Sequence, residues 1–214
     1  LEAEAGQVGR LFNPRGKFVH TENVFGFHTI LTLGLKMLGQ WERGCREFLD
    51  IEVHERDVPV DGLPTAFDGF RVMHVSDLHI DIEPKLTPIV AAKIADAADR
   101  YDLCVFTGDY RWKSCGPYKR SLELMQPIIE AVNGPALAVL GNHDSAHMVA
   151  GLEAAGMTVL LNEQHVVERD GVKLVIAGVD DPHHYQTDDL GKALGDVDAA
   201  TPVILLSHSP DGYD

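Results

Sequence analysis

Residues 73–81 read MHVSDLHID, and this stretch decides the fold. An apolar run ends on a carboxylic acid, Asp77, and an imidazole, His79, follows two positions later. Three other apolar runs end in a similar way: VFTGDY at 105–110, VLGNHD at 139–144 and ILLSHS at 204–209. Each of these runs predicts a short strand that delivers metal-binding side chains at its carboxyl end.

Apolar runs and helical patterns alternate through the middle of the chain. Helical periodicity predicts four helices, at 86–100, 118–132, 145–156 and 188–196. Between and after them, strands are predicted at 70–76, 102–108, 135–141, 157–162, 165–170, 172–179 and 202–208. Near-continuous apolar strands separated by helices are typical of an α/β fold with a buried, largely parallel sheet. The closely spaced strands after residue 157 predict an antiparallel or mixed part.

The amino-terminal region differs in pattern from the rest. Residues 1–20 are polar and predict a loosely held arm, and spaced apolar residues predict an amphipathic helix from Asn23 to about Arg43. Alternation at 48–60 predicts a strand. We therefore divide the chain into an arm with a helix, 1–45, and one domain, 46–214. Residues 24–41 are expected to contact a membrane or a lipid substrate, or alternatively to pack as a helix on the core.

The composition argues against several classes of protein. Acidic residues outnumber basic ones 33 to 18, so the net charge of −15 disfavours nonspecific binding to nucleic acids. Three cysteines without a CxxC pair argue against a disulfide framework and predict a reducing compartment, the cytoplasm. The apolar residues 24–41 add an expected peripheral contact with the inner membrane. No stretch reaches the roughly 18 uncharged apolar residues that a membrane span requires.

The polar residues at the strand ends suggest a metal site. Ligands gather beyond the carboxyl ends of strands in α/β sheets, so these side chains are expected at one edge of the sheet. The candidate residues are Asp77, His79, Asp109, Asn142, His143, Asp144 and His208. Carboxylate, carboxamide and imidazole ligands suit Mn²⁺, Fe²⁺ or Zn²⁺. Asp109 could bridge two such ions, and Gly108 and Gly141 allow the backbone to turn sharply beside them.

The motifs DLH, GD and GNHD, and the strand that ends in His208, resemble in order four of the five blocks of the calcineurin-like metallophosphoesterases. The intervals are 32 residues from Asp77 to Asp109, 33 to Asn142 and 66 to His208. The resemblance covers residues 70–208. It is greatest to the bacterial branch with YkuE-type phosphodiesterases and enzymes that hydrolyse UDP-diacylglucosamine. It implies a layered αββα sandwich with mixed sheets.

The resemblance also implies a role for each site residue. Asp77 and His79 would bind one metal ion, Asp109 would bridge, and Asn142 and His208 would bind a second ion. A hydroxide bridging the two ions would attack phosphorus directly. His143 would stabilise the transition state or protonate the leaving oxygen, and Asp144 would orient it.

Two departures from the family pattern stand out. The fifth block, Gly-His-x-His, does not follow His208, and we expect it beyond Asp214; the alternative is a degenerate relative. In GDYRW, Tyr110, Arg111 and Trp112 stand where many relatives carry an acid or amide. Arg111 is expected to bind substrate phosphate or, alternatively, to be a surface arginine or to form a local ion pair. His183 and His184 precede His208 and do not fit the fifth block, but they could line the substrate pocket.

The leading interpretation is a metal-dependent hydrolase of phosphomonoester, phosphodiester or pyrophosphate bonds with two divalent cations. Its substrate would be a small-molecule or lipid-linked phosphate. Two alternatives remain: a nuclease on the same fold, which the negative charge disfavours, and a non-catalytic relative that binds one metal ion or none.

Overall fold

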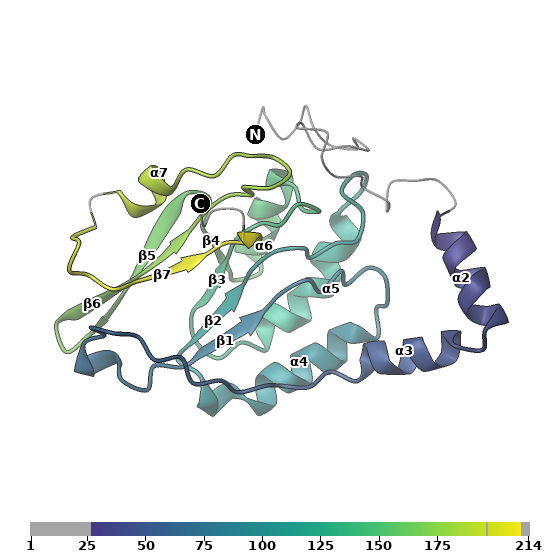
Figure 1. The fold of residues 1–214 in the computed structure, drawn as a ribbon, viewed down its shortest axis with the longest axis horizontal. Coiled ribbons are helices and arrows are strands. Elements are labelled where there is room, and N and C mark those ends of the chain that lie inside the picture. Colours follow the sequence, from purple (N-terminus) through teal and green to yellow (C-terminus); the bar gives the residue numbers. More distant parts are fainter. Residues whose placement is uncertain (1–26, 196, 211–214) are drawn as a thin grey trace.

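The computed structural model describes residues 27–195 and 197–210, which contain two sheets (Figure 1). The first sheet has the order β1-β2-β3-β4, and all of its strands are parallel. Its strands are β1 (Val72–Val75), β2 (Leu103–Phe106), β3 (Ala136–Ala138) and β4 (Thr158–Val159). In the second sheet an antiparallel hairpin is followed by a parallel strand: β5 (Glu163–Arg169), β6 (Val172–Gly178) and β7 (Val203–Leu206). The predicted parallel sheet and the predicted mixed part are both confirmed.

Helices cover the outer face of each sheet, giving a layered α–β–β–α arrangement (Figure 1). Side chains of α4 (Leu86–Asp96), α5 (Lys119–Glu130) and α6 (Val149–Ala154) pack on one face of the first sheet. The short helix α7 (Leu190–Leu194) packs through Ala193 against β6. Short 3-10 turns complete the elements: η2 (Thr65–Phe67), η3 (Ala98–Arg100) and η4 (Ala146–Met148).

Strand alternation assigns each buried side chain to one of two cores. Cys104 and Phe106 of β2 face the helices. Leu103 and Val105 face the second sheet, where they join a cluster that includes Leu137 of β3. Because β2 and β3 are buried on both faces, they are fixed from both sides. Their carboxyl ends therefore form a rigid base for the loops that follow.

The amino-terminal predictions need two corrections. The single helix predicted over 23–43 is two helices, α2 (Phe27–Met37) and α3 (Trp41–Leu49), because Gly39 adopts a left-handed conformation at φ 66°. The strand predicted over 48–60 is wrong, since α3 continues to Leu49 and residues 50–60 have no regular secondary structure. The arm predicted over 1–20 lies outside the described residues.

The core between the sheets can be tested at Leu137, which has no exposed surface. Replacing Leu137 by Ala removes packing from both sheets and is expected to lower the free energy of unfolding by about 2–5 kcal/mol. Val166→Ala on β5, whose side chain is 44% exposed, serves as the control and is expected to change it by less than about 0.5 kcal/mol. Urea denaturation measures both, and equal effects would contradict the assigned core.

Candidate metal centre

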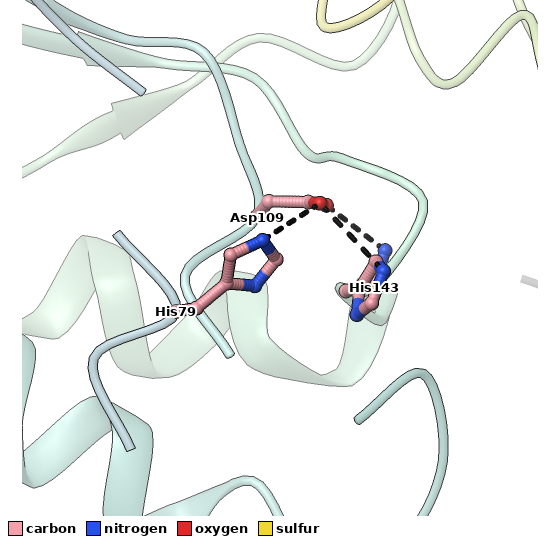
Figure 2. A group of neighbouring side chains, drawn as sticks. All are labelled: His79, Asp109 and His143. Carbon is pink, nitrogen blue, oxygen red and sulfur yellow. Dashed lines mark hydrogen bonds and ion pairs between the residues drawn. The ribbon is translucent and has the colours of Figure 1, made fainter. Parts of the chain in front are cut away.

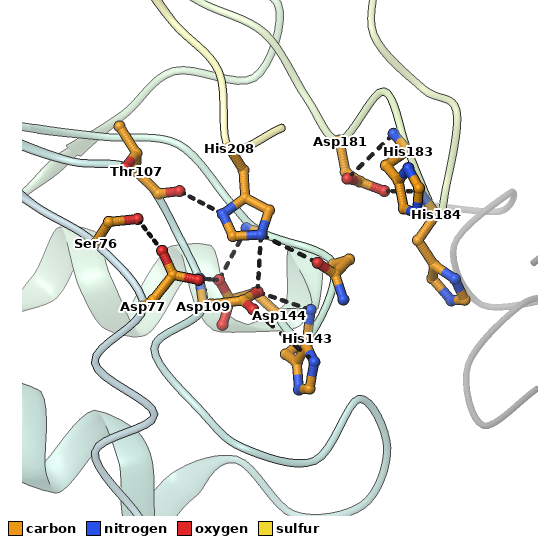
Figure 3. Close-up of polar contacts among 12 residues, drawn as sticks. Ser76, Asp77, Thr107, Asp109, His143, Asp144, Asp181, His183, His184 and His208 are labelled. Carbon is orange, nitrogen blue, oxygen red and sulfur yellow. Dashed lines mark hydrogen bonds and ion pairs between the residues drawn. The ribbon is translucent and has the colours of Figure 1, made fainter. Parts of the chain in front are cut away.

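The candidate residues meet at one end of the two packed sheets, beyond the carboxyl ends of β1, β2, β3 and β7 (Figure 3). Asp77, Asp109 and His143 follow strands of the first sheet, whereas His208 follows a strand of the second sheet. The predicted convergence is confirmed in space. The prediction that all four strand ends belong to one sheet is wrong, because β7 pairs with β6 and not with the first sheet.

Three imidazoles point their Nε2 atoms at the carboxylate of Asp109. The Nε2 atoms of His79 and His143 lie 3.6 and 3.9 Å from Oδ2 of Asp109, on either side of it (Figure 2). The Nε2 atom of His208 lies 3.5 Å from Oδ1 (Figure 3). These separations exceed those of ordinary hydrogen bonds. They suit ligand atoms that share an ion, since two atoms about 2.1 Å from a tetrahedral ion are roughly 3.4 Å apart.

Each of these imidazoles is held at its other nitrogen by a backbone carbonyl. Nδ1 of His79 lies 2.8 Å from the carbonyl oxygen of Arg111, and Nδ1 of His143 contacts that of Trp112. Nδ1 of His208 lies 2.8 Å from the carbonyl oxygen of Thr107. A carbonyl only accepts, so Nδ1 must carry the proton in all three rings. The Nε2 lone pair of the neutral ring is then available for a metal ion.

The backbone around the site is held in unusual conformations. Asp77, His79 and Asp109 have positive φ angles of 55°, 39° and 56°. Non-glycine residues rarely adopt this region, and each instance costs on the order of 1–3 kcal/mol. Hydrogen bonds beyond the strand ends stabilise it: the amide of Asp77 donates to Gly108 at 3.1 Å, and that of His79 donates to Asp109 at 3.0 Å. The loops after β1 and β2 are thus fastened together.

Gly108 and Gly141 bring the loops after β2 and β3 into direct contact. A Cβ atom on Gly108 would lie 2.3 Å from the amide nitrogen of Gly141. A Cβ atom on Gly141 would lie 2.2 Å from Oδ1 of Asp109. The sequence predicts that these glycines allow sharp turns beside the metal ions. The structure shows a further reason for them: only residues without a side chain allow the two loops to approach so closely.

Asp144 connects the loops after β2 and β3 through hydrogen bonds to their backbone amides. Its buried carboxylate accepts hydrogen bonds from the amides of Asp109, Tyr110 and Gly141 at 2.7, 3.0 and 2.9 Å. The predicted role of Asp144, orienting His143, is wrong, because the carbonyl of Trp112 takes that position. Burial raises the pKa of Asp144 to about 7, the Asp109 carboxylate adds to this shift, and the three amides oppose it.

His208 closes the site from the second sheet. Its Nε2 atom lies 3.0 Å from Oδ1 of Asn142, so the two predicted ligands of one metal ion are neighbours. Burial disfavours the charged ring, but the Asp109 carboxylate and the Thr107 carbonyl outweigh this effect and raise the pKa of His208. The carboxylates of Asp109, Asp77 and Asp144 around the His208 ring thus favour positive charge at this place in the site.

Two groups of side chains in the described residues could hold a metal ion. One contains His79, Asp109 and His143, and the other contains Asp77, Asp109 and His208; within each group the ligand atoms lie within 4.8 Å of one another. Asp109 belongs to both, as a bridging ligand would. The grouping places His143 beside His79, and Asp77 beside His208, which differs from the pairs that the family pattern implies. This set of oxygen and nitrogen donors fits first-row divalent cations.

The predicted substrate-binding residues lie elsewhere or make other contacts. Arg111 is 2% exposed, and its guanidinium donates to the carbonyl oxygens of His143, Gly116 and Ser114. The prediction that it binds substrate phosphate is therefore wrong, and so are its alternatives, a surface arginine and an ion pair; its guanidinium bonds to backbone carbonyls instead. His184 is 1% exposed and its ring packs against Tyr185 at a centroid distance of 4.7 Å, so it does not line an open pocket.

The loop that carries His183 and His184 is organised by Asp181. The buried carboxylate of Asp181 accepts hydrogen bonds from the amides of His183, His184 and Tyr185 at 3.3, 2.6 and 2.6 Å. Burial raises the pKa of Asp181, and these amide hydrogen bonds oppose the shift. His183 is partly exposed in this turn, and its predicted contact with substrate stays a prediction.

Comparison with known proteins finds one matching family and several relatives. The model of the calcineurin-like phosphoesterase family matches residues 70–213. The chain is 30% identical over 169 residues to the uncharacterized metallophosphoesterase YkuE of Bacillus subtilis, covering 75% of this chain and 58% of YkuE. It is 26% identical over 153 residues to the phosphodiesterase YaeI of Escherichia coli, covering 68% of this chain and 54% of YaeI.

A putative metallophosphoesterase of Caenorhabditis elegans is 26% identical over 200 residues, covering 86% of this chain and 40% of that protein. The chain thus spans about half the length of the relatives that it matches. The family match covers every strand end that contributes to the site, from Asp77 to His208.

The contact between the two glycine loops can be tested with Gly141→Ala. The added methyl group would displace the Asp109 carboxylate, and we expect the affinity for Mn²⁺ to fall by about tenfold or more. Isothermal titration calorimetry measures the affinity. Gly44→Ala in α3 is the control, because its Cβ atom would meet nothing within 4 Å and its metal affinity should equal that of the parent. Unchanged binding by both variants would contradict the assigned role of Gly141.

Proposed function

The chain belongs to the calcineurin-like phosphoesterase family, in its YkuE-like branch, and on that premise we propose that it hydrolyses phosphoester or pyrophosphate bonds at a dinuclear metal centre. The observation that carries the proposal is the convergence of His79, His143 and His208 on the Asp109 carboxylate. These residues come from four separate strand ends. The Nε2 atoms of the three imidazoles lie 3.6, 3.9 and 3.5 Å from the carboxylate oxygens of Asp109, which is too long for ordinary hydrogen bonds but suits ligands that share an ion.

The chain's own residues prepare the site for a doubly charged ligand. Asp77 and Asp109 supply carboxylates, and Asp109 is in reach of both candidate metal positions. When bound, two divalent cations would polarise the phosphoryl oxygens and lower the pKa of a shared water molecule so that it can attack phosphorus. Asp77 is exposed, so a substrate can approach from solvent on its side of the site.

We assign His143 to the transition state and not to permanent metal binding, following the family pattern. Its Nδ1 proton is held by the carbonyl of Trp112, and its backbone amide donates to Oδ1 of Asp109 at 3.0 Å. The ring therefore has one preferred orientation, with Nε2 directed to the centre of the site. From there a protonated ring could donate to a phosphoryl or leaving-group oxygen.

Asp109→Asn tests the enzyme proposal. The amide keeps the size of the side chain but removes the negative charge and the second acceptor oxygen, so hydrolysis should fall by about 10³-fold or more. Turnover of bis-p-nitrophenyl phosphate with added Mn²⁺ measures it. Asp68→Asn, at an exposed position in the turn before β1, is the matched control and should keep the parent activity.

Metal stoichiometry separates the proposal from its alternatives. Two equivalents of Mn²⁺ per full-length protein, with turnover above the Asp109→Asn background, are the expected result. One equivalent or fewer, with no turnover, would instead indicate a non-catalytic metal-binding relative. Salt-sensitive binding of single-stranded DNA would favour the nuclease alternative.

We also propose that α2 and the turn after it contact a lipid surface. Ile30, Met37 and Leu38 are 73%, 83% and 73% exposed, and α2 stands away from both sheets (Figure 1). Lys36 is the only charged residue in 29–41, although the whole chain carries −15. The polar residues Thr29, Thr32 and Lys36 recur at helical spacing along one side of α2, and apolar residues occupy most of the rest of its surface. Such an amphipathic helix, which here carries no acidic residue, suits a lipid interface. Within 27–195 and 197–210, no helix is long and apolar enough to cross a membrane.

Substituting the exposed apolar residues tests this contact. The double variant Ile30→Glu, Met37→Glu should lower binding to phosphatidylcholine–phosphatidylglycerol vesicles by about tenfold or more, because two apolar side chains no longer enter the interface. Co-sedimentation measures the bound fraction. Val166→Glu, on the exposed face of β5, is the control and should bind as the parent does. Equal binding by all three proteins, or a dimer that only the double variant abolishes, would reject the lipid surface.

A further inference from the structure

Arg111 is a buried arginine that the proposed chemistry does not use. Its three nitrogen atoms each donate to a backbone carbonyl: Nε to His143 at 2.6 Å, Nη1 to Gly116 at 3.0 Å and Nη2 to Ser114 at 3.0 Å. The side chain therefore folds residues 111–116 into a compact loop. It also ties this loop to the GNHD segment after β3.

The backbone of the same loop faces the candidate metal centre. The carbonyl of Arg111 accepts the Nδ1 proton of His79 at 2.8 Å, and the carbonyl of Trp112 accepts that of His143. The indole of Trp112 packs on both imidazoles, at centroid distances of 5.3 Å from His79 and 5.9 Å from His143. The amide of Trp112 donates to Asp81 at 2.7 Å, which fixes the loop on its remaining side.

We propose that Arg111 is a positioning residue that fixes the tautomer and orientation of His79 and His143 by holding the loop whose carbonyls bind their Nδ1 protons. The two carbonyls are adjacent in sequence, so any rotation of the loop moves both imidazoles together. One side chain thereby sets the Nε2 atoms of His79, a proposed metal ligand, and of His143, the proposed transition-state residue, on either side of Asp109. The proposal rests on the function proposed for this site, but its consequences for the imidazoles can be observed without catalysis.

A planar guanidinium suits this task better than an ammonium. Its donors are fixed in one plane and can reach three carbonyls at once, whereas lysine carries a single nitrogen. Removing the guanidinium leaves the carbonyls of the buried residues His143 and Ser114 without their donors, which destabilises the loop. A loop freed in this way no longer holds either Nδ1 proton in place.

The experiment compares Arg111→Met and Arg111→Lys with a control arginine. Arg169→Met is the control, because Arg169 pairs with Asp102 at 2.6 Å and packs on Phe70, on the opposite side of the first sheet from α4 and α5. Three quantities are measured for each protein. They are the imidazole tautomers by ¹⁵N nuclear magnetic resonance without metal, the affinity for Mn²⁺ by calorimetry, and kcat and KM for bis-p-nitrophenyl phosphate.

In the parent, the neutral rings of His79 and His143 should carry their proton on Nδ1. In Arg111→Met they should become a mixture of tautomers, with about tenfold weaker Mn²⁺ binding and a lower kcat at a KM within about twofold of the parent. Arg169→Met should lose stability but keep the tautomers and the affinity. If Arg111→Met does not fold, the same measurements are made on Arg111→Lys. This variant keeps the positive charge but lacks the planar guanidinium and its several donors.

Two outcomes would overturn the proposal. Parent-like tautomers and Mn²⁺ affinity in a folded Arg111 variant would show that residues 111–116 keep their conformation without the arginine side chain. A raised KM with an unchanged kcat would show that Arg111 binds substrate directly. Failure of the proposed function is seen separately, because a parent protein that neither binds Mn²⁺ nor hydrolyses the ester can still show the tautomer change.

Discussion

The site depends on three imidazoles that are each held at Nδ1 by a backbone carbonyl and directed at one buried carboxylate. The carbonyls belong to Thr107, Arg111 and Trp112, all within six residues of one loop. That loop follows β2, which is buried on both faces and cannot shift without disturbing both cores. The orientation of the metal-binding atoms therefore depends on a strand that is packed on both faces. This explains how side chains from two different sheets can meet within about 4 Å of Asp109.

Carboxylates gathered at one end of the sheets repel one another, and two features of the fold reduce this repulsion. Asp144 is buried and its pKa is raised by burial and by Asp109, yet three amides donate to it and keep it in place. His208, at the other side of Asp109, has a raised pKa because the surrounding acids favour positive charge there. The acids that raise the pKa of His208 also make this a region whose electrostatic potential attracts cations. A divalent ligand would be bound where that potential is most negative.

The sequence alone predicted the alternation of strands and helices and the residues that converge, because strand ends in an α/β fold leave side chains at predictable places. The sequence did not predict features that depend on a neighbouring strand or on a backbone atom. The alternation at 48–60 resembles a strand, but no neighbouring strand receives it, and Val58 is 75% exposed. Asp144 was expected to orient His143, yet a carbonyl does so. Carbonyl oxygens are present at every residue, so no residue type marks the ones that Thr107, Arg111 and Trp112 present to the imidazoles.

The positive φ angles of Asp77, His79 and Asp109 show what this arrangement costs. Left-handed backbone at three residues stores strain of several kcal/mol, which hydrogen bonds between the loops and the close contact of Gly108 with Gly141 must offset. A site assembled only when a ligand arrives would need no such strain in advance. Since the tautomers and the backbone are already set, the binding energy of a metal ion or a phosphate group need not be spent on reorganising the protein. The strain is thus best understood as the cost of a preorganised centre.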